Sequence, residues 1–206
     1  MKKGKGFTLV EMLVVISILS VVGVLILTIF TNTLKGSNKS QIIGVIKQNG
    51  QSVLEIMDKT IRNVDNVVCL SNDSKTLVVV KDGLYTRYRF TDPRPSSNPT
   101  VNGFSEQDNP VKGTDPSTGR EYADPAFVNK VCFANDPMDQ STLTLLTNTQ
   151  AQSGVSVENG SFTKDPSAGY KDQVTIKFDL KPGVQAPQAV AGQIDSVHFQ
   201  TTIQLR

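Results

Sequence analysis

The sequence predicts an α+β fold in which a long N-terminal transmembrane helix packs against an antiparallel β-sheet. The first 30 residues contain a long apolar run, and apolar residues continue at helical spacing to about residue 65. Beyond that point, short runs alternate between apolar and polar residues, as half-buried antiparallel strands do. A helix followed by strands is typical of the α+β class.

The apolar run is long enough to cross a membrane. Residues 12–30 contain no charged side chain, and at 1.5 Å per residue they span roughly 28 Å of helix, close to the thickness of the hydrocarbon core. No later run is comparably apolar, so we expect a single-pass protein. Lys2, Lys3 and Lys5 favour an N-terminus in the cytoplasm, with the bulk of the chain outside.

Two simple interpretations of this N-terminus leave something unexplained. A secretory signal peptide fits poorly, because the apolar run is long and no small-residue cleavage signal follows it. A plain signal anchor explains everything except Glu11, a carboxylate inside the apolar segment. A charge at membrane depth costs a few kcal/mol, so such residues usually have a partner and a function.

The stretch KGFTLVEMLVVISIL, residues 5–19, resembles the prepilin N-terminus shared by type IV pilins and the pseudopilins of type II secretion and competence systems. A basic leader ends in glycine, Phe-Thr-Leu follows, and an acid stands four residues after the phenylalanine, before an unbroken apolar run. The resemblance implies a pilin-like fold. It also implies that prepilin peptidase cuts between Gly6 and Phe7, and that the new amine of Phe7 is N-methylated, which keeps its positive charge.

The same resemblance gives Glu11 a partner. After the cut, the Phe7 ammonium lies about one helical turn from Glu11, and in a packed filament the amine of an adjoining subunit is equally close. An ion pair offsets the desolvation of both groups. In the family this acid is thought to align an incoming subunit with its neighbour, so the resemblance implies an assembly ion pair between Glu11 and Phe7.

Three segments are predicted along the chain. Residues 1–6 form the leader peptide, residues 7–30 the transmembrane half of the helix, and residues 31–206 an extracytoplasmic domain. In that domain the helix continues to about residue 65 and carries one apolar stripe. The stripe consists of Ile42, Ile46, Gly50, Val53, Met57, Ile61 and Val64. Glycine at position 50 would allow the helix to approach a sheet closely.

The remainder predicts strands. Residues 75–90 contain two β-rich runs hinged at Asp82 and Gly83, which is a strong hairpin signal. Residues 174–180 and 196–206 alternate strictly between apolar and polar side chains. Shorter candidate strands are residues 66–71, 129–134, 142–147 and 154–157.

Residues 91–127 hold six of the ten prolines and predict a long loop without regular structure. This loop is either a surface that contacts a neighbour, a substrate or an environmental target, or a tolerated insertion. Its acidic residues lack the spacing of an EF-hand, so no metal site is assigned.

The second half bears a less specific resemblance. Its helix end at residues 53–68, its hairpin strand at 84–90 and its last strand at 199–206 resemble the minor pilins and pseudopilins of the J or W type. Those subunits are thought to prime filament assembly or to lie near the filament tip. An abundant shaft subunit is the alternative.

The two cysteines lie in similar phrases, VCLSND at residues 68–73 and VCFAND at residues 131–136. Each phrase predicts a strand that enters an Asn-Asp turn. Outside the cytoplasm disulfides persist, so a bridge between Cys69 and Cys132 is favoured over two buried free thiols.

Enzyme chemistry finds little support. The chain has one histidine, His198, on the polar face of a predicted strand, and no metal-ligand cluster, nucleophile elbow or phosphate loop. We therefore expect no catalytic residues and no cofactor. The formal net charge is +2 and no basic stripe interleaved with aromatic residues is present, so direct nucleic-acid binding is not expected.

These patterns together predict a structural subunit of a type IV pilus or pseudopilus, stored in the cytoplasmic membrane and polymerised through its N-terminal helix into an extracytoplasmic or cell-surface filament. The implied partners are other pilin or pseudopilin subunits in a homo- or heteropolymer, prepilin peptidase, the membrane and the pilus assembly platform. The competing hypothesis is a membrane-anchored extracytoplasmic binding module that does not polymerise. A tethered enzyme is a third.

Overall fold

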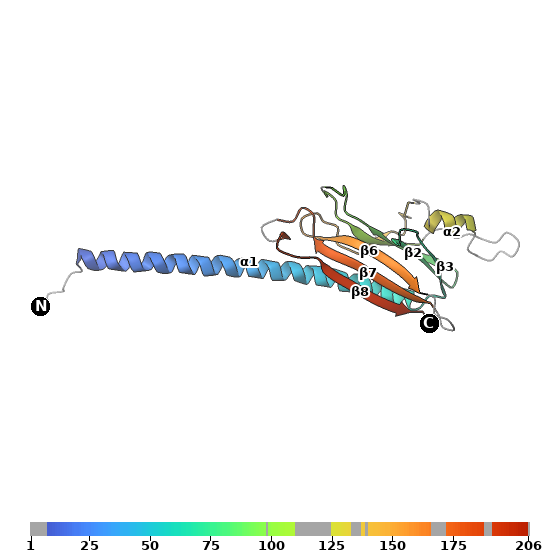
Figure 1. Cartoon of the computed structure of the whole chain (residues 1–206), viewed down its shortest axis with the longest axis horizontal. Helices are drawn as coiled ribbons and strands as arrows, with labels where there is room; N and C mark the ends of the chain where they lie inside the picture. Colours follow the sequence, from blue (N-terminus) through green and yellow to red (C-terminus); the bar gives the residue numbers. More distant parts are fainter. Residues whose placement is uncertain are drawn as a thin grey trace. The chain divides into compact units, whose positions relative to one another are not determined.

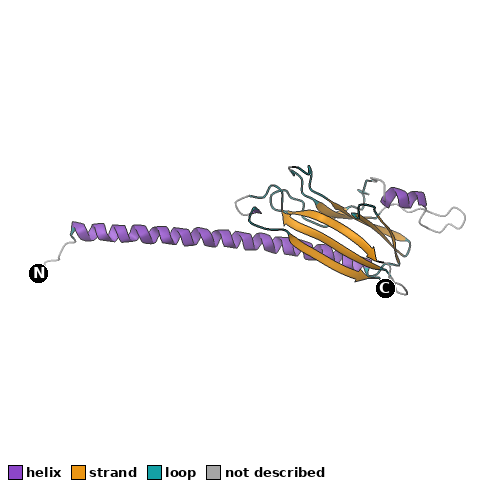
Figure 2. Ribbon diagram, in the orientation of Figure 1, coloured by secondary structure: helices purple, strands orange, loops and turns teal. Residues whose placement is uncertain are grey.

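The structure, a computed structural model, consists of two compact units, Met1–Gln41 and Ile42–Arg206. It describes residues 8–97, 99–109, 125–132, 137–138, 140–165, 172–187 and 191–205. Helix α1 (Leu9–Ile61) supplies the described part of the first unit, and the second unit adds antiparallel sheets. The helix and the strands, drawn in purple and orange in Figure 2, confirm the α+β class.

The first unit is an apolar helix with its side chains uncovered. Its most apolar 18-residue window has a mean hydropathy of 3.0, and none of that window is buried. By length and composition this helix is able to cross a membrane. Its hydroxyl groups donate to the helix backbone, as Ser20 does to the Ile16 carbonyl at 2.8 Å and Thr28 to the Val24 carbonyl at 2.9 Å. Such bonds let polar side chains sit in an apolar run without water.

Two antiparallel sheets make up most of the second unit. One has five strands in the order β1-β2-β3-β4-β5, and the other has three in the order β6-β7-β8. The elements are β1 (Asn66–Leu70), β2 (Thr76–Lys81), β3 (Leu84–Thr91), β4 (Phe104–Asp108), α2 (Pro125–Cys132), β5 (Thr144–Leu145), β6 (Val155–Asp165), β7 (Gln173–Pro182) and β8 (Val197–Gln204). In Figure 1 the strands β6, β7 and β8 lie beside the last part of α1.

The predicted hairpin at Asp82 and Gly83 is confirmed. Strands β2 and β3 pair from Thr76 opposite Arg89 to Lys81 opposite Leu84, so only those two residues form the turn. Both have positive φ, 48° at Asp82 and 73° at Gly83. A two-residue turn of type I′ requires this backbone, and Asp-Gly is one of its preferred sequences.

The core lies between α1 and the sheets. The buried residues of α1 are Ile46, Gly50, Val53, Met57 and Ile61, as the stripe predicts. On β7 the predicted alternation is also confirmed, because Val174, Ile176, Phe178 and Leu180 are all buried. These residues belong to one apolar cluster with Phe90 of β3 and Phe162 of β6.

Aromatic rings connect the two sheets within this core. The ring centroid of Phe90 lies 4.8 Å from that of Phe162 and 5.5 Å from that of Phe178, and Phe178 lies 5.3 Å from Phe199. Backbone bonds add to the connection, since the Phe162 N–H donates to the Ser74 carbonyl at 2.7 Å. The sheets are thus held together by stacked rings and by the edge of β6.

Gly50 is where the helix and the three-stranded sheet approach most closely. A Cβ atom built at Gly50 would lie 2.2 Å from the ring of Phe199 on β8. No side chain fits at that distance, so glycine is required for the end of the Phe199 ring to contact the helix backbone.

Helix α1 ends at Ile61, four residues before the predicted end near residue 65. The next backbone bonds span three residues, from the Asn63 N–H to the Thr60 carbonyl and from the Val64 N–H to the Ile61 carbonyl. A tightened last turn of this kind satisfies terminal carbonyls. Val64 is nevertheless buried, so it continues the stripe outside the helix.

The prediction of one irregular loop over residues 91–127 is wrong in two places. Strand β4 (Phe104–Asp108) lies inside it and pairs with β3, and helix α2 begins at Pro125. An antiparallel backbone bridge between Arg94 and Val101 closes the segment between them into a short loop that leads back to strand β4. Residues 110–124 lie outside the described residues.

The prediction of a strand at residues 129–134 is also wrong, because residues 129–132 form the last turn of helix α2. Pro125 suits a first helical position, where its missing N–H costs nothing. Val131 and Cys132 then pack against Val78 and Tyr85 of the five-stranded sheet. Tertiary packing therefore overrides the β propensity of this short segment.

The other short candidates were close to the observed strands. Residues 66–71 contain β1, residues 142–147 contain the two-residue β5, and residues 154–157 contain only the start of β6. Strand β6 continues to Asp165 through an irregularity between Glu158 and Ser161, where Asn159 has a positive φ of 53°. A bulge of this kind interrupts the alternation that a sequence pattern detects.

Replacing Gly50 by Leu should lower the free energy of unfolding of the second unit by about 2 kcal/mol, because the new side chain displaces Phe199 from the helix. Gly44→Leu is the matched control. Nothing lies within 4 Å of a Cβ at Gly44, so this change should be neutral or stabilise by up to about 1 kcal/mol. Denaturant unfolding of the full chain in detergent measures both, and equal stabilities would contradict the close approach.

Candidate functional site

The first turn of α1 is closed by a reciprocal pair of hydrogen bonds. The Thr8 hydroxyl accepts a bond from the Glu11 N–H at 3.3 Å, and the Glu11 carboxylate accepts bonds from the Thr8 N–H at 2.8 Å and the Thr8 hydroxyl at 2.9 Å. This arrangement is a capping box, in which Thr8 is the N-cap and Glu11 the third helical residue. The T-x-x-E pattern of residues 8–11 could have predicted this cap from the sequence, where only the charge of Glu11 was considered.

The capping box gives Glu11 a partner within its own chain. All of its bonds from Thr8 reach Oε2. Within the described residues, Oε1 accepts no hydrogen bond. A carboxylate has about four acceptor sites, so Glu11 retains capacity for a further donor. Gly6 and Phe7 lie outside the described residues, and so do the leader lysines.

A disulfide and a buried ion pair hold helix α2 to the five-stranded sheet. Cys69 of β1 is bonded to Cys132 of α2, with Cα atoms 6.2 Å apart, within the range typical of disulfides. Both cysteines are buried in a small cluster with Val78, Tyr85 and Val131.

Arg87 of β3 and Asp108 of β4 form the ion pair, with 1% and 0% of their side chains exposed. The guanidinium donates to both carboxylate oxygens, at 2.9 Å and 2.6 Å. It also donates to the carbonyls of Val131 at 3.4 Å and Pro137 at 3.0 Å. A buried ion pair is tolerated only when such further bonds satisfy its donors, so the pair requires α2 and the residues after it to stay in place.

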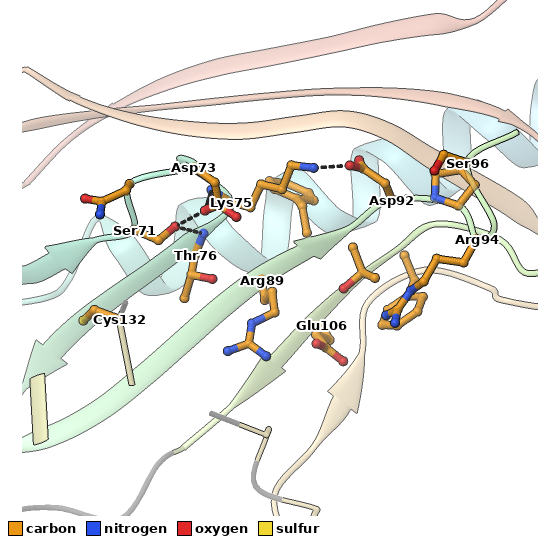
Figure 3. A pocket seen from close by; sticks show the side chains of 15 residues that line it. Ser71, Asp73, Lys75, Thr76, Arg89, Asp92, Arg94, Ser96, Glu106 and Cys132 are labelled. Carbon is orange, nitrogen blue, oxygen red and sulfur yellow. Dashed lines mark hydrogen bonds and ion pairs between the residues drawn. The ribbon is translucent and has the colours of Figure 1, made fainter. Parts of the chain in front are cut away.

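A pocket of about 620 Å³ opens beside this ion pair (Figure 3). Arg89 and Glu106 stand two residues from Arg87 and Asp108 on the same strands, so they share the outer face of the sheet. The lining comes from the turn 71–76, strand β3, the loop 92–96, strand β4 and Cys132. The pocket therefore gathers segments that are far apart in the sequence.

Glu106 is the most buried acid in this pocket, with 7% of its surface exposed. Burial raises the pKa of Glu106 above its ordinary value, and the Arg89 guanidinium, directly opposite on β3, opposes the rise. Burial also acts to raise the pKa of Asp73, but hydrogen bonds from the Ser71 hydroxyl and the Lys75 N–H outweigh it and hold that pKa below its ordinary value.

Two further charge pairs lie near the sheets. Lys75 forms an ion pair with Asp92 at the pocket rim. His198 is 79% exposed on β8 and pairs with Asp179 of β7, which fits its predicted place on the polar face. Among the described residues, no group of three or more His, Cys, Asp or Glu side chains is placed to hold a metal ion.

Residues 1–27 match the family model of the prokaryotic N-terminal methylation motif. This motif is the signature of type IV pilins and pseudopilins, and it confirms the resemblance that residues 5–19 indicate. It supports a pilin-like precursor that is processed at its N-terminus. No curated protein and no solved structure matches the chain.

The Cys69–Cys132 bridge should leave no reactive thiol in the denatured, unreduced protein. The two residues are 63 positions apart, for which the chain-entropy relation gives on the order of 4 kcal/mol of stabilisation. Thiol titration of the chain extracted without reductant, with a reduced sample as the control, checks the bridge. Two reactive thiols before reduction would show that it does not form.

Proposed function

We propose that this chain is a structural, non-enzymatic subunit of a type IV pilus or pseudopilus, processed by prepilin peptidase between Gly6 and Phe7 and assembled through its N-terminal helix. The observation that carries the proposal is the methylation motif at residues 1–27, at the head of an apolar helix whose membrane-length window is entirely uncovered. Such a surface needs lipid before assembly and neighbouring helices after it.

The proposed location follows from charge. Lys2, Lys3 and Lys5 favour a cytoplasmic N-terminus, which leaves the sheets outside the cytoplasmic membrane. In the mature state the subunit joins an extracytoplasmic or cell-surface filament with other pilin or pseudopilin subunits, on the pilus assembly platform. An oxidising compartment also suits the Cys69–Cys132 bridge.

A minor or priming role is the finer proposal. It rests on the resemblance of residues 53–68, 84–90 and 199–206 to J- and W-type subunits. The proline that major subunits usually carry within the span is also missing near Thr28.

For Glu11 we propose two successive tasks. The bonds to Thr8 close the first helical turn and partly satisfy the carboxylate in the stored subunit. After cleavage, the methylated ammonium of Phe7, from the same or an adjoining subunit, approaches the oxygen that Thr8 leaves open. Methylation keeps the charge of that amine, so the ion pair survives the modification.

Gly6→Val should block processing, because the peptidase is expected to need a small residue immediately before the cut. Mass spectrometry of the membrane-extracted protein should find an N-terminus at Phe7 in the wild type and an uncut leader in the variant. A wild-type protein that begins at Met1 or Lys2 would support the membrane-anchored binding module instead.

Glu11→Gln should leave cleavage, insertion and the outer domain intact but reduce entry into the filament at least about tenfold. Glutamine can replace glutamate in a capping box, so only the charge is lost. Breaking a buried ion pair costs about 3–5 kcal/mol. The measurement is the ratio of filament-bound to membrane-stored protein, or the number of filaments per cell if the subunit acts in few copies.

Two companion variants separate the roles of Glu11. Glu11→Ala removes both the cap and the charge, whereas Thr8→Val removes the capping hydroxyl and keeps the charge. If Glu11→Gln assembled as well as wild type while Glu11→Ala and Thr8→Val failed, the cap alone would explain Glu11, and the ion-pair account would be wrong.

A further inference from the structure

The pocket on the outer face of the five-stranded sheet contains a carboxylate and a guanidinium that can each form further hydrogen bonds, one as an acceptor and the other as a donor. Glu106 has 7% of its surface exposed, and within the described residues no hydrogen-bond donor reaches its carboxylate. The Arg94 guanidinium is exposed and, in the same described part, has no hydrogen-bond acceptor. Figure 3 shows Glu106 between Arg89 and Arg94, and both arginines act electrostatically on it.

The other charges of the pocket are engaged with each other. Lys75 pairs with Asp92, and Asp73 accepts bonds from Ser71 and Lys75. Arg89 stands opposite Glu106 in the strand register. Within the described lining, Arg94 is thus a cation whose side chain makes no hydrogen bond or ion pair, although the lining charges as a whole balance.

The shape and the remaining lining limit what can bind. A volume of about 620 Å³ lies within the range of roughly 300–1,000 Å³ typical of ligand pockets. Phe104 is half-buried and adds an apolar wall, while Thr91 and Ser96 add hydroxyl groups. A ligand that fits should carry an anion for Arg94, a donor for Glu106 and an apolar group for Phe104.

We propose that this pocket binds the C-terminal residue of a peptide. The terminal carboxylate accepts the planar fork of Arg94, the last amide N–H donates to Glu106, and an apolar last side chain packs on Phe104. A guanidinium pairs with a carboxylate through two parallel hydrogen bonds. One terminal residue thus satisfies both groups, whereas an isolated cation satisfies only Glu106 and an anion without an O–H or N–H satisfies only Arg94.

Charge favours a carboxylate over a phosphate. The three cations and three carboxylates among the described lining residues sum to zero, and the neighbouring Glu106 repels a dianion more strongly than a monoanion. When the monoanion has an N–H next to it, that N–H can donate to the Glu106 carboxylate, and this hydrogen bond offsets the repulsion between the two carboxylates. Peptide binding here concerns only the outer unit and does not require polymerisation, so this inference and the proposed pilus function can fail independently.

Fluorescence anisotropy of a labelled Gly-Gly-Phe peptide, titrated with the full chain in detergent, tests the proposal. Two altered peptides change one feature each: a C-terminal amide removes the carboxylate, and a depsipeptide replaces the last amide N–H by an ester oxygen. The amide should bind at least about tenfold more weakly, and the depsipeptide several-fold more weakly than the parent peptide.

Protein variants complete the test. Arg94→Gln should weaken the free-acid peptide at least about tenfold and leave the weak binding of the amide unchanged, while Arg94→Lys should recover only part of the loss. Lys177→Gln, an exposed change on β7 outside the pocket, is the matched control and should bind normally. A thermal melt of each variant confirms that it is folded.

Four outcomes would overturn the proposal. They are equal binding of the acid and amide peptides, equal binding of the parent peptide and depsipeptide, equal losses in Arg94→Gln and Lys177→Gln, and tighter competition by inorganic phosphate than by N-acetylphenylalanine. The altered peptides and the competitors test the wild-type protein, so three of these four outcomes do not depend on the folding of any variant.

Discussion

The contact between Gly50 and the ring of Phe199 sets how closely α1 approaches the three-stranded sheet. Because the ring lies against bare helix backbone, it also reaches Phe178, and that ring reaches Phe90 of the other sheet. The distance between helix and sheet is therefore passed on to the second sheet through aromatic packing. A larger residue at position 50 would disturb both sheets, since close-packed cores transmit small displacements.

A second constraint acts on the outer face of the five-stranded sheet. Arg87 and Asp108 are buried and need the carbonyls of Val131 and Pro137 to complete their hydrogen bonds. This need keeps α2 over one half of the face, and the Cys69–Cys132 bridge secures the same segment. The next pair along the strands, Arg89 and Glu106, lines the pocket together with Cys132, whereas Arg87 and Asp108 do not line it.

Local signals were enough for part of this fold. The Asp82-Gly83 turn and the alternation over residues 174–180 were legible because the backbone of a tight turn and the two faces of a strand depend on neighbouring residues. Strand β4 and helix α2 were not, because β4 depends on pairing with β3 and α2 on packing against Val78. At the N-terminus, residues 5–19 indicated the methylation motif, but the outer pocket unites residues that only the strand register brings together.

The N-terminal helix shows how one acid can serve both storage and assembly. In a lone subunit an unpaired carboxylate at the membrane would be costly, and the bonds from Thr8 reduce that cost without any partner. The capping geometry needs a glutamate or glutamine three residues after Thr8, and the proposed cut after Gly6 puts the new amine immediately before Thr8. The same spacing therefore holds Oε2 within the subunit and leaves Oε1 for an ammonium. In this proposal, cleavage supplies a charged donor at a carboxylate that the helix has already positioned, and it links processing to assembly through the first turn of α1.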